Sequence, residues 1–482
     1  MLKIAKSDSR LYLHPYRCYN NHNNYYEGRS RYFMKIFHAC DIRGVAGTEL
    51  TEEITHNIGL AVGVKLVGKK VVVGGDIRLS TPVLKGIMIK ALVQSGCEVI
   101  DIGTVATPVF YYALKVTKAF GGVMVTASHN PAPYNGFKLV FGDQPVSEED
   151  ILEIKQMVED GVSILGEGTV VTLPIVEEYI ASTAALAQKS KLRVVVDAGN
   201  GATSQIAPAL FKRLGYEVIE LYCQPDGNFP NRSPNPALAE NLKGLGEKVR
   251  ENGANVGVAF DGDGDRVAFV DENGRPVDND DIIVLIAQYY LEKQPGTIIY
   301  DAKCSMVAPE QILKAGGKPI MARAGHTFSK AAFLAEKALF AGEISGHFFF
   351  RELGYDDGMF AGLKVCEFVA AHGSLAALVD EIPNYILTPD IRITYKGSDK
   401  EAVLDEVAQT LEKYQPNRID GVRIEFSDGW GMIRASVTEP LFTLRFEAKS
   451  VQRLQEIIKI LVDALPDNIK TAVMNALPPQ YK

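Results

Sequence analysis

Apolar and polar positions follow one another in the same order three times along the chain. Each copy has a β-branched apolar run, a polar or glycine-containing turn, a helical stretch and a second apolar run, and the copies begin at Lys69, Lys191 and Pro295. A glycine, typical of helix C-termini, follows each helical stretch, at Gly96, Gly215 and Gly316. The pattern predicts three βαβ units whose continuous apolar strands form a sheet covered on both faces.

The pattern changes after about residue 388. One helical pattern, three strand patterns and a final amphipathic helix follow, at 403–414, 421–426, 432–437, 441–448 and 451–465. Asp428 and Gly429 are expected to form the turn between the first two of these strands. We therefore predict an α/β fold with three similar mixed-sheet α/β domains in series and a C-terminal α+β domain.

Four domains are expected after an N-terminal extension. Residues 1–33 are polar, basic and rich in tyrosine, and they lack the apolar segment of a secretory signal. We expect this extension to be disordered or to result from a start codon assigned too early, since the stretch that begins at Met34 is typical of a natural start. The expected domains are 34–178, 179–282, 283–387 and 388–482.

Composition narrows the class of protein further. The chain has 482 residues, a formal net charge of -8 and a pI near 5.6, which argues against nucleic-acid binding. No apolar run is long enough to cross a bilayer, so we expect no membrane partner. Six cysteines are scattered without the spacing of a zinc site, which is typical of reduced thiols and indicates a cytoplasmic protein.

The first candidate site follows the apolar run 121–125. Ser128 and His129 come directly after it, and Lys138 lies ten residues beyond Ser128. Small residues before Ser128 favour an exposed hydroxyl at the carboxyl end of a strand, where open α/β sheets place ligands. His129 and Lys138 can transfer protons or stabilise charge, and the residues do not separate these roles. An ordinary turn is the alternative, whereas the absence of a GxSxG elbow argues against a hydrolase triad.

The second candidate site lies between two apolar strands. Asp261, Asp263 and Asp265 alternate with glycines, so their carboxylates can converge on one Mg²⁺ ion. Arg266 is placed to hold a phosphate oxygen. An EF-hand does not fit, because strands flank the loop and the glutamate of that motif is missing.

Two further motifs carry polar side chains at alternate positions. Glu343, Ser345 and His347 offer donors and acceptors to sugar hydroxyls, and Arg434, Ser436 and Thr438 suit a phosphate dianion. Each has a structural alternative, a polar loop for the first and an exposed strand edge for the second.

Together the four motifs resemble those of the α-D-phosphohexomutases, specifically the bacterial phosphomannomutase/phosphoglucomutase branch. The resemblance extends from about Lys35 to the C-terminus and implies four domains around a central cleft. It implies that Ser128 is a phosphoserine and binds Mg²⁺ together with Asp261, Asp263 and Asp265. It also implies sugar contacts from the Glu343 motif, distal phosphate contacts from the Arg434 motif, and further active-site positions at Arg43, His129, Lys138, Arg266, Lys303 and His326.

The implied reaction is reversible phosphoryl transfer between the 1- and 6-positions of mannose and glucose phosphates. It would proceed through phospho-Ser128 and a hexose 1,6-bisphosphate, with the fourth domain as a mobile lid. Hexose phosphates would be the small-molecule partners of a monomer, or alternatively of a dimer. Two positions depart from the branch, namely Cys40 in place of tyrosine and Val437 in place of asparagine or glycine. The alternatives are a phosphoglucosamine mutase, a serine-dependent sugar phosphatase and a non-catalytic sugar-phosphate sensor.

Overall fold

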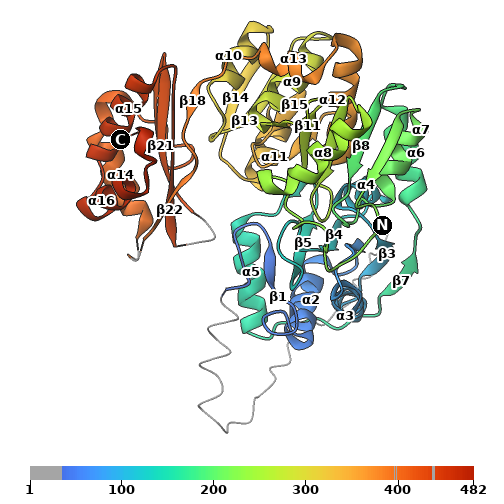
Figure 1. Ribbon diagram of the computed structural model, residues 1–482. Helices are drawn as coiled ribbons and strands as arrows, with labels where there is room; N and C mark the ends of the chain where they lie inside the picture. Colours follow the sequence, from blue (N-terminus) through green and yellow to red (C-terminus); the bar gives the residue numbers. More distant parts are fainter. Residues whose placement is uncertain (1–34, 396, 398, 437–439, 482) are drawn as a thin grey trace, which may run out of the picture. The chain divides into compact units, whose positions relative to one another are not determined.

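The computed structural model describes residues 35–395, 397, 399–436 and 440–481 (Figure 1). The expectations for residues 1–33 and the positions Val437 and Thr438 lie outside the described residues. The chain divides into two compact units, Met1–Tyr179 with Pro225–Pro230, and Ile180–Gln224 with Asn231–Lys482. Within the described part of the chain, no helix is both long and apolar enough to cross a membrane.

The first unit contains a mixed sheet in the order β1-β5-β4-β2-β3-β7, with β6 beside β5. Its strands are β1 (Ile42–Val45), β2 (Lys70–Gly75), β3 (Glu98–Thr104), β4 (Gly121–Val125), β5 (Tyr134–Phe141), β6 (Gln144–Pro145) and β7 (Thr169–Thr172). Its helices are α2 (Glu52–Leu66), α3 (Thr81–Gln94), α4 (Thr107–Thr117) and α5 (Glu148–Glu159), and α6 (Val176–Ala185) leads into the second unit. Strand β2 is parallel to β3 and β4, as the βαβ pattern predicts, whereas β5 is antiparallel to β4 and β1.

Helices cover both faces of this sheet. A Cβ atom built on Gly121 of β4 would meet Leu66 of α2, while one built on Gly122 would meet Phe110 of α4. Because neighbouring residues of a strand point to opposite faces, α2 and α4 lie on opposite sides. Strand β4 is buried along its whole length for this reason, which confirms the prediction from its continuous apolar run.

The second unit begins with two further mixed sheets, in the orders β12-β11-β10-β8-β9 and β14-β13-β15-β16-β17. Their strands are β8 (Arg193–Asp197), β9 (Glu217–Leu221), β10 (Val256–Phe260), β11 (Val267–Asp271), β12 (Pro276–Val277), β13 (Thr297–Asp301), β14 (Lys318–Ala322), β15 (Phe340–Gly342), β16 (Phe348–Phe350) and β17 (Tyr355–Asp356). The helices among them are α7 (Ile206–Arg213), η1 (Ala239–Leu242), α8 (Lys243–Asn252), α9 (Asn279–Leu291), α10 (Val307–Lys314), α11 (His326–Ala335), α12 (Gly358–His372) and α13 (Leu375–Asp380).

The predicted repeat is confirmed in these sheets, because β8 is parallel to β9 and β13 is parallel to β14. The three glycines after the repeat helices have φ angles of +85° at Gly96, +87° at Gly215 and +80° at Gly316. Glycine adopts these left-handed angles without a steric penalty, so the sequence marks the end of each helix.

The C-terminal part is α+β, as predicted. Its sheet has the order β18-β22-β21-β20, with β19 also on β22, and α14, α15 and α16 contribute to one core with it (Figure 1). The strands are β18 (Ile386–Leu387), β19 (Ile391–Thr394), β20 (Val422–Phe426), β21 (Gly429–Ala435) and β22 (Leu441–Ala448). The helices are α14 (Lys400–Thr410), η2 (Glu412–Tyr414), α15 (Val451–Asp463), α16 (Asp467–Ala476) and η3 (Pro479–Tyr481).

The predicted start of the second C-terminal strand was wrong. Strand β21 begins at Gly429 rather than at Met432, because Cβ atoms on Gly429 and Gly431 would meet Ile457 of α15 at 2.6 and 3.1 Å. Glycines here let the helix pack closely on the strand, although glycine disfavours strands by propensity. Helix α16 was missed.

Candidate functional site

The serine loop lies between β4 and β5 in the first unit. Ser128 Oγ is 3.2 Å from His129 Nδ1. Arg43 on β1 donates to Asn130 Oδ1 at 3.1 Å and forms an ion pair with Asp41 at 2.6 Å. Lys138 lies on β5, opposite Met124 of β4. Ser128, His129 and Arg43 thus gather at the loop after β4, and Lys138 is on the strand that follows it.

Ser128 is buried, with 1% of its surface exposed, so the expectation of an exposed hydroxyl was wrong. The backbone of this loop is held by Arg78, whose guanidinium donates to Ser128 O at 2.8 Å and to Asn130 O at 2.6 Å. Sequence reasoning missed Arg78, although it lies two residues beyond Asp76, just after the apolar run of the first repeat. That position after a buried strand is the signal that could have identified it.

The loop with Asp261, Asp263 and Asp265, here called the metal loop after its predicted role, connects the antiparallel strands β10 and β11, as predicted. Asp261, Asp263 and Asp265 are all buried, and each offers a carboxylate oxygen that lies within 4.8 Å of the other two. Asp261 Oδ1 accepts hydrogen bonds from the backbone N–H groups of Gly264 at 2.8 Å and of Arg266 at 3.2 Å. Three buried carboxylates repel one another unless a cation neutralises them, and an all-oxygen donor set fits a hard divalent ion.

The loop with Glu343, Ser345 and His347, here called the sugar loop after its predicted role, connects β15 and β16. Ser345 Oγ donates to Glu343 Oε2 at 2.8 Å and lies 3.0 Å from His347 Nδ1, so the three side chains predicted from alternate positions do meet. Burial opposes ionisation of Glu343, but the hydrogen bond and charge of His347 outweigh it and lower the Glu343 pKa to about 2. The loop therefore holds an ionised acceptor at neutral pH.

His347 joins the sugar loop to the metal loop. Its Nε2 lies 3.5 Å from Asp265 Oδ2 and 3.3 Å from Arg266 Nε. Burial and Arg266 disfavour the protonated ring, yet Asp265 and Glu343 outweigh them and raise the His347 pKa to about 9. Two cationic side chains, His347 and Arg266, thus lie beside the metal loop, where they suit an anionic substrate.

His326 also reaches this cluster, through a residue that the sequence did not single out. Its ring lies 5.1 Å from that of His347, and its Nε2 is 2.9 Å from Asp356 Oδ1. Asp356 is fully buried, and pairing of β16 with β17 brings it opposite Phe349. Its place depends on this strand pairing, which periodicity does not reveal.

Arg434 of the predicted phosphate motif and Lys303, predicted as a further active-site position, are each paired with a carboxylate. Arg434 Nε is 2.8 Å from Asp420 Oδ2, and Lys303 Nζ is 2.9 Å from Asp390 Oδ2. Arg445, which was missed, donates to Lys303 O at 2.8 Å.

The charges of these cations converge on one carboxylate. Burial opposes ionisation of Asp390, but the nearby charges of Lys303, Arg445 and Arg434 outweigh it and lower the Asp390 pKa. The carbonyl of Ser436 accepts a hydrogen bond from Lys400. The three cations form a group whose positive charge suits a phosphate dianion.

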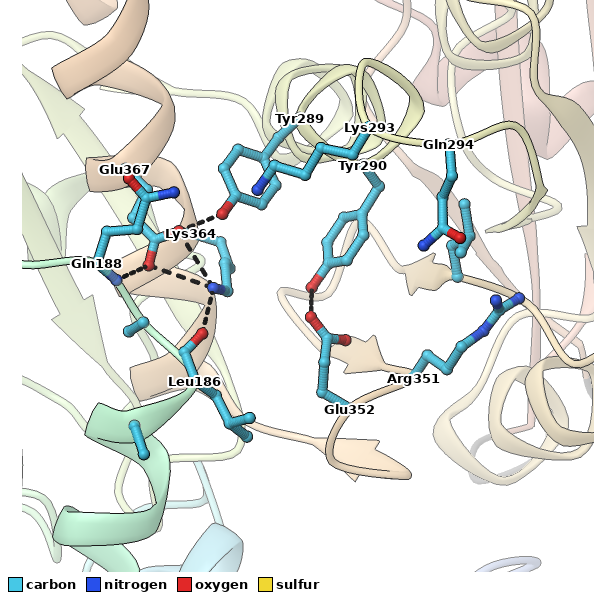
Figure 2. A pocket seen from close by; sticks show the side chains of 13 residues that line it. Leu186, Gln188, Tyr289, Tyr290, Lys293, Gln294, Arg351, Glu352, Lys364 and Glu367 are labelled. Carbon is cyan, nitrogen blue, oxygen red and sulfur yellow. Dashed lines mark hydrogen bonds and ion pairs between the residues drawn. The ribbon is translucent and has the colours of Figure 1, made fainter.

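A pocket of about 570 Å³ elsewhere in the second unit is not this site (Figure 2). Its ion pair of Lys364 and Glu367 has an N–O distance of 3.1 Å, and Glu367 also accepts hydrogen bonds from Tyr289 and from Gln188 N. Lys364 donates to Leu186 O at 2.9 Å. These groups satisfy one another, and their hydrogen bonds join α9 and α12 to the segment after α6. The residues of the four motifs do not line the pocket.

The chain matches four domain families in order. They are the phosphoglucomutase/phosphomannomutase alpha/beta/alpha domains I (residues 34–163), II (177–274) and III (278–385), and the phosphoglucomutase/phosphomannomutase C-terminal domain (391–464).

Known proteins of similar length match almost the whole chain. A phosphomannomutase/phosphoglucomutase of Pseudomonas putida is 42% identical over 88% of this chain and 93% of its own length. A phosphoglucomutase of Neisseria gonorrhoeae is 38% identical over 89% of this chain and 97% of its own. A crystal structure of a Burkholderia thailandensis phosphoglucomutase/phosphomannomutase family protein has a TM-score of 0.85 and 35% identity, covering 92% of this chain and 99% of that one.

The order of the four domains and the identity over most of both chains agree with the geometry of the metal and sugar loops. The chain belongs to the phosphoglucomutase/phosphomannomutase family of the α-D-phosphohexomutases, and it is a mutase, an enzyme of the isomerase class.

Proposed function

We propose that the chain interconverts the 1- and 6-phosphates of mannose and glucose through phospho-Ser128 and a hexose 1,6-bisphosphate. One observation carries the proposal: the buried cluster of three aspartates in the metal loop is connected to the sugar loop by His347, which contacts Asp265. This arrangement suits binding of a cation and recognition of a sugar within one group of side chains. The names of the Pseudomonas and Neisseria relatives support the choice of substrates.

In the proposed reaction, the phosphoryl group moves from Ser128 Oγ to the free hydroxyl of a bound hexose monophosphate. The proton of that hydroxyl passes to His129 or Lys138, and the bond between phosphorus and Ser128 Oγ breaks as the new ester bond forms. The bisphosphate then turns, its other phosphoryl group returns to Ser128, and the proton goes back to the departing sugar oxygen. The overall reaction consumes neither water nor a nucleotide.

The side chains divide the work by charge. Asp261, Asp263 and Asp265 would hold Mg²⁺ together with phospho-Ser128, and the ion would neutralise charge on the transferring group. Arg266 and Arg43 would add positive charge to the same phosphoryl group.

The distal phosphate and the sugar would be held by separate groups. Lys303, Arg434, Ser436 and Thr438 would bind the distal phosphate. Glu343, Ser345, His347 and His326 would bind the sugar hydroxyls. Since Asp390 and Asp420 pair with the cations here, a bound phosphate would compete with carboxylates for them.

We also propose a cytoplasmic monomer that binds hexose phosphates. Five described cysteines form no disulfide, which is typical of reducing compartments. Hexose phosphates carry two negative charges at neutral pH, which the cations near Asp390 would match.

The test compares the wild type with Ser128→Ala and with Ser163→Ala, a serine exposed on the surface of the same unit. Each protein is assayed with Mg²⁺ and catalytic glucose 1,6-bisphosphate on mannose, glucose and glucosamine 1-phosphates, and released phosphate is measured in parallel. We expect isomerisation of the first two sugars by the wild type and Ser163→Ala, with loss of at least 10³-fold in Ser128→Ala. Undiminished activity of Ser128→Ala would disprove the scheme.

The wild type alone separates the remaining functions. Isomerisation of glucosamine 1-phosphate alone would identify a phosphoglucosamine mutase. Release of phosphate without an isomer would identify a phosphatase, and neither product would indicate a sugar-phosphate sensor.

A further inference from the structure

Ser128 has a backbone conformation that a non-glycine residue rarely adopts, with φ of +50°. Such conformations persist only where the surroundings hold them. Both backbone polar groups of Ser128 are held by side chains, since its N–H donates to Thr126 Oγ1 at 2.9 Å and its C=O accepts from Arg78 Nη2 at 2.8 Å. Thr126 and Arg78 therefore fix the peptide groups on both sides of the Ser128 Cα atom.

Arg78 holds the rest of the loop as well. Besides Ser128 O, its guanidinium donates to Asn130 O at 2.6 Å, Pro131 O at 2.8 Å and Tyr134 O at 2.9 Å. The side chain is fully buried, so these bonds form in a low dielectric, where they are strong. One side chain thus binds four backbone carbonyls, three in the loop after β4 and one at the first residue of β5.

Asp76 connects the two side chains that hold Ser128. Its Oδ2 accepts from Thr126 Oγ1 at 2.7 Å and from Arg78 Nε at 3.1 Å. Its Oδ1 accepts from Arg78 N at 2.9 Å and from Thr81 Oγ1 at 2.7 Å. Asp76, Arg78 and Thr126, here called the serine clamp, form one buried network with the loop.

The second repeat has an aspartate in the corresponding place. Asp197 ends β8, as Asp76 follows β2, and its Oδ1 accepts from the N–H group two residues on, at Gly199, at 2.7 Å. Its Oδ2 accepts from Arg232 Nε at 2.8 Å, and Arg232 donates to Phe260 O at 2.8 Å. Phe260 directly precedes Asp261, so this aspartate reaches the metal loop through an arginine.

The third repeat makes the same connection without an arginine. Asp301 ends β13, and its Oδ1 accepts from Lys303 N, again two residues on, at 2.7 Å. Its Oδ2 accepts directly from Ile344 N at 2.9 Å, inside the sugar loop. In each repeat, one carboxylate oxygen of a buried aspartate accepts a hydrogen bond from the backbone of its own turn. The other oxygen connects to the loop that carries the predicted site residues, namely the serine, metal or sugar loop.

We propose that Asp76, Arg78 and Thr126 are positioning residues that hold Ser128 in the backbone conformation required for phosphoryl transfer, and that Asp197 and Asp301 position the metal and sugar loops in the same way. The inference rests on the proposed role of Ser128 as phosphoryl carrier. It adds residues that touch neither substrate nor cation and act through the loop backbone.

The test removes one hydroxyl from the serine clamp. Thr126→Val keeps the shape of the side chain but loses the acceptor for Ser128 N and the donor to Asp76, whereas Thr126→Ser keeps both. Thr55→Val is the matched control, because Thr55 is buried in the same unit and its hydroxyl has no hydrogen-bond partner among the residues that the structure describes. For Thr126→Val we expect kcat to fall at least tenfold with KM changed less than threefold, recovery in Thr126→Ser, and no change in Thr55→Val.

Hydrogen exchange separates this inference from the proposed function. Backbone exchange of residues 126–130 is expected to be at least fivefold faster in Thr126→Val than in the wild type, whichever reaction the enzyme catalyses. Unchanged exchange together with unchanged kcat would overturn the serine clamp. If the exchange changes as expected but the wild type isomerises no hexose phosphate, the proposed function fails and the clamp stands.

A second variant tests the third repeat in the other unit. Asp301→Asn keeps the size of the side chain and one acceptor oxygen, so one of the bonds to Lys303 N and Ile344 N is lost in either orientation of the amide. We expect KM for glucose 1-phosphate to rise at least fivefold while Ser128 is phosphorylated to the wild-type level. An unchanged KM would overturn the role of Asp301, including in the case where Thr126→Val does not fold.

Discussion

Glu447 offers a sharp test of how the C-terminal sheet is attached to the domain before it. The residue lies on β22 with 1% of its surface exposed. Its carboxylate accepts from Trp430 Nε1 at 2.6 Å, from Met306 N at 2.7 Å, and from Ser305 Oγ. Trp430 and Met306 also share an apolar cluster with Ala302 and Met432. One buried carboxylate therefore joins β21 and β22 to the residues at the start of α10.

The perturbation is Glu447→Leu, compared with Glu447→Gln. Leucine leaves two donors buried without an acceptor, the N–H groups of Met306 and Trp430, while the Ser305 hydroxyl can rotate. At about 1–3 kcal/mol for each unsatisfied donor, the expected loss is about 2–6 kcal/mol. Glutamine keeps one acceptor oxygen and loses the charge, so about 1–2 kcal/mol is expected.

The assay is urea unfolding followed by fluorescence. Trp430 is the one tryptophan of the chain, so the signal reports unfolding at this joint. With a slope of about 2 kcal/mol per molar urea, a loss of about 4 kcal/mol lowers the midpoint by about 2 M for Glu447→Leu. Glu447→Gln should lower it by less than about 1 M. Glu406→Leu, at an exposed position on α14, is the control for the added apolar side chain.

One result would refute this reasoning. If Glu447→Leu and Glu406→Leu unfold at the same urea concentration as the wild type, the carboxylate does not hold the two domains together. A midpoint that falls equally in both variants would assign the effect to the added apolar side chain rather than to lost hydrogen bonds.

Three further predictions concern the metal loop, a buried acid and a crowded glycine. Removal of divalent ions with EDTA should abolish isomerisation. Adding Mg²⁺ should restore activity in the wild type, whereas the same Mg²⁺ concentration should not restore it in Asp263→Asn. Full activity in EDTA would exclude a role for the cation in the reaction. Burial raises the pKa of Asp280 to about 6, so its contribution to stability is complete below about pH 4 and is lost as the pH rises through about 6. Asp280→Asn should therefore gain up to about 3 kcal/mol relative to the wild type across that interval in urea titrations, and a constant difference would contradict this assignment. A Cβ atom on Gly136 would lie 2.2 Å from Ile42 O. Gly136→Ala should therefore lower the free energy of unfolding by about 1–3 kcal/mol, seen as a lower Tm, and should lower kcat by displacing Arg43. An unchanged Tm would show that β1 moves freely.

Sequence patterns predicted elements well where local chemistry decides the structure. The helix ends at Gly96, Gly215 and Gly316 follow from the left-handed angle that glycine favours. The Asp261 loop follows from alternating carboxylates between two apolar strands, and both strands form as expected. By contrast, the start of β21 was missed because packing against α15 outweighs the low strand propensity of Gly429.

The candidate site was only partly accessible from the sequence. Its motif residues stand close together in the chain, so spacing found them. Arg78, Asp356 and Arg445 act across 50, 30 and 142 residues, to reach Ser128, His326 and Lys303 respectively. Such separations leave no periodic trace, and only the folded chain shows them.

The sequence by itself determined the three repeats, the change to an α+β domain and the chemistry of the four loops, because hydrophobic period and local turn chemistry are properties of neighbouring residues. Tertiary structure alone decided that Ser128 is buried with φ of +50°, that His347 keeps a raised pKa between Asp265 and Glu343, and that an aspartate supports the motif loop of each repeat. These features depend on burial and on contacts between distant strands. Burial sets the strength of a charge or hydrogen bond, and it exists only once the chain has folded.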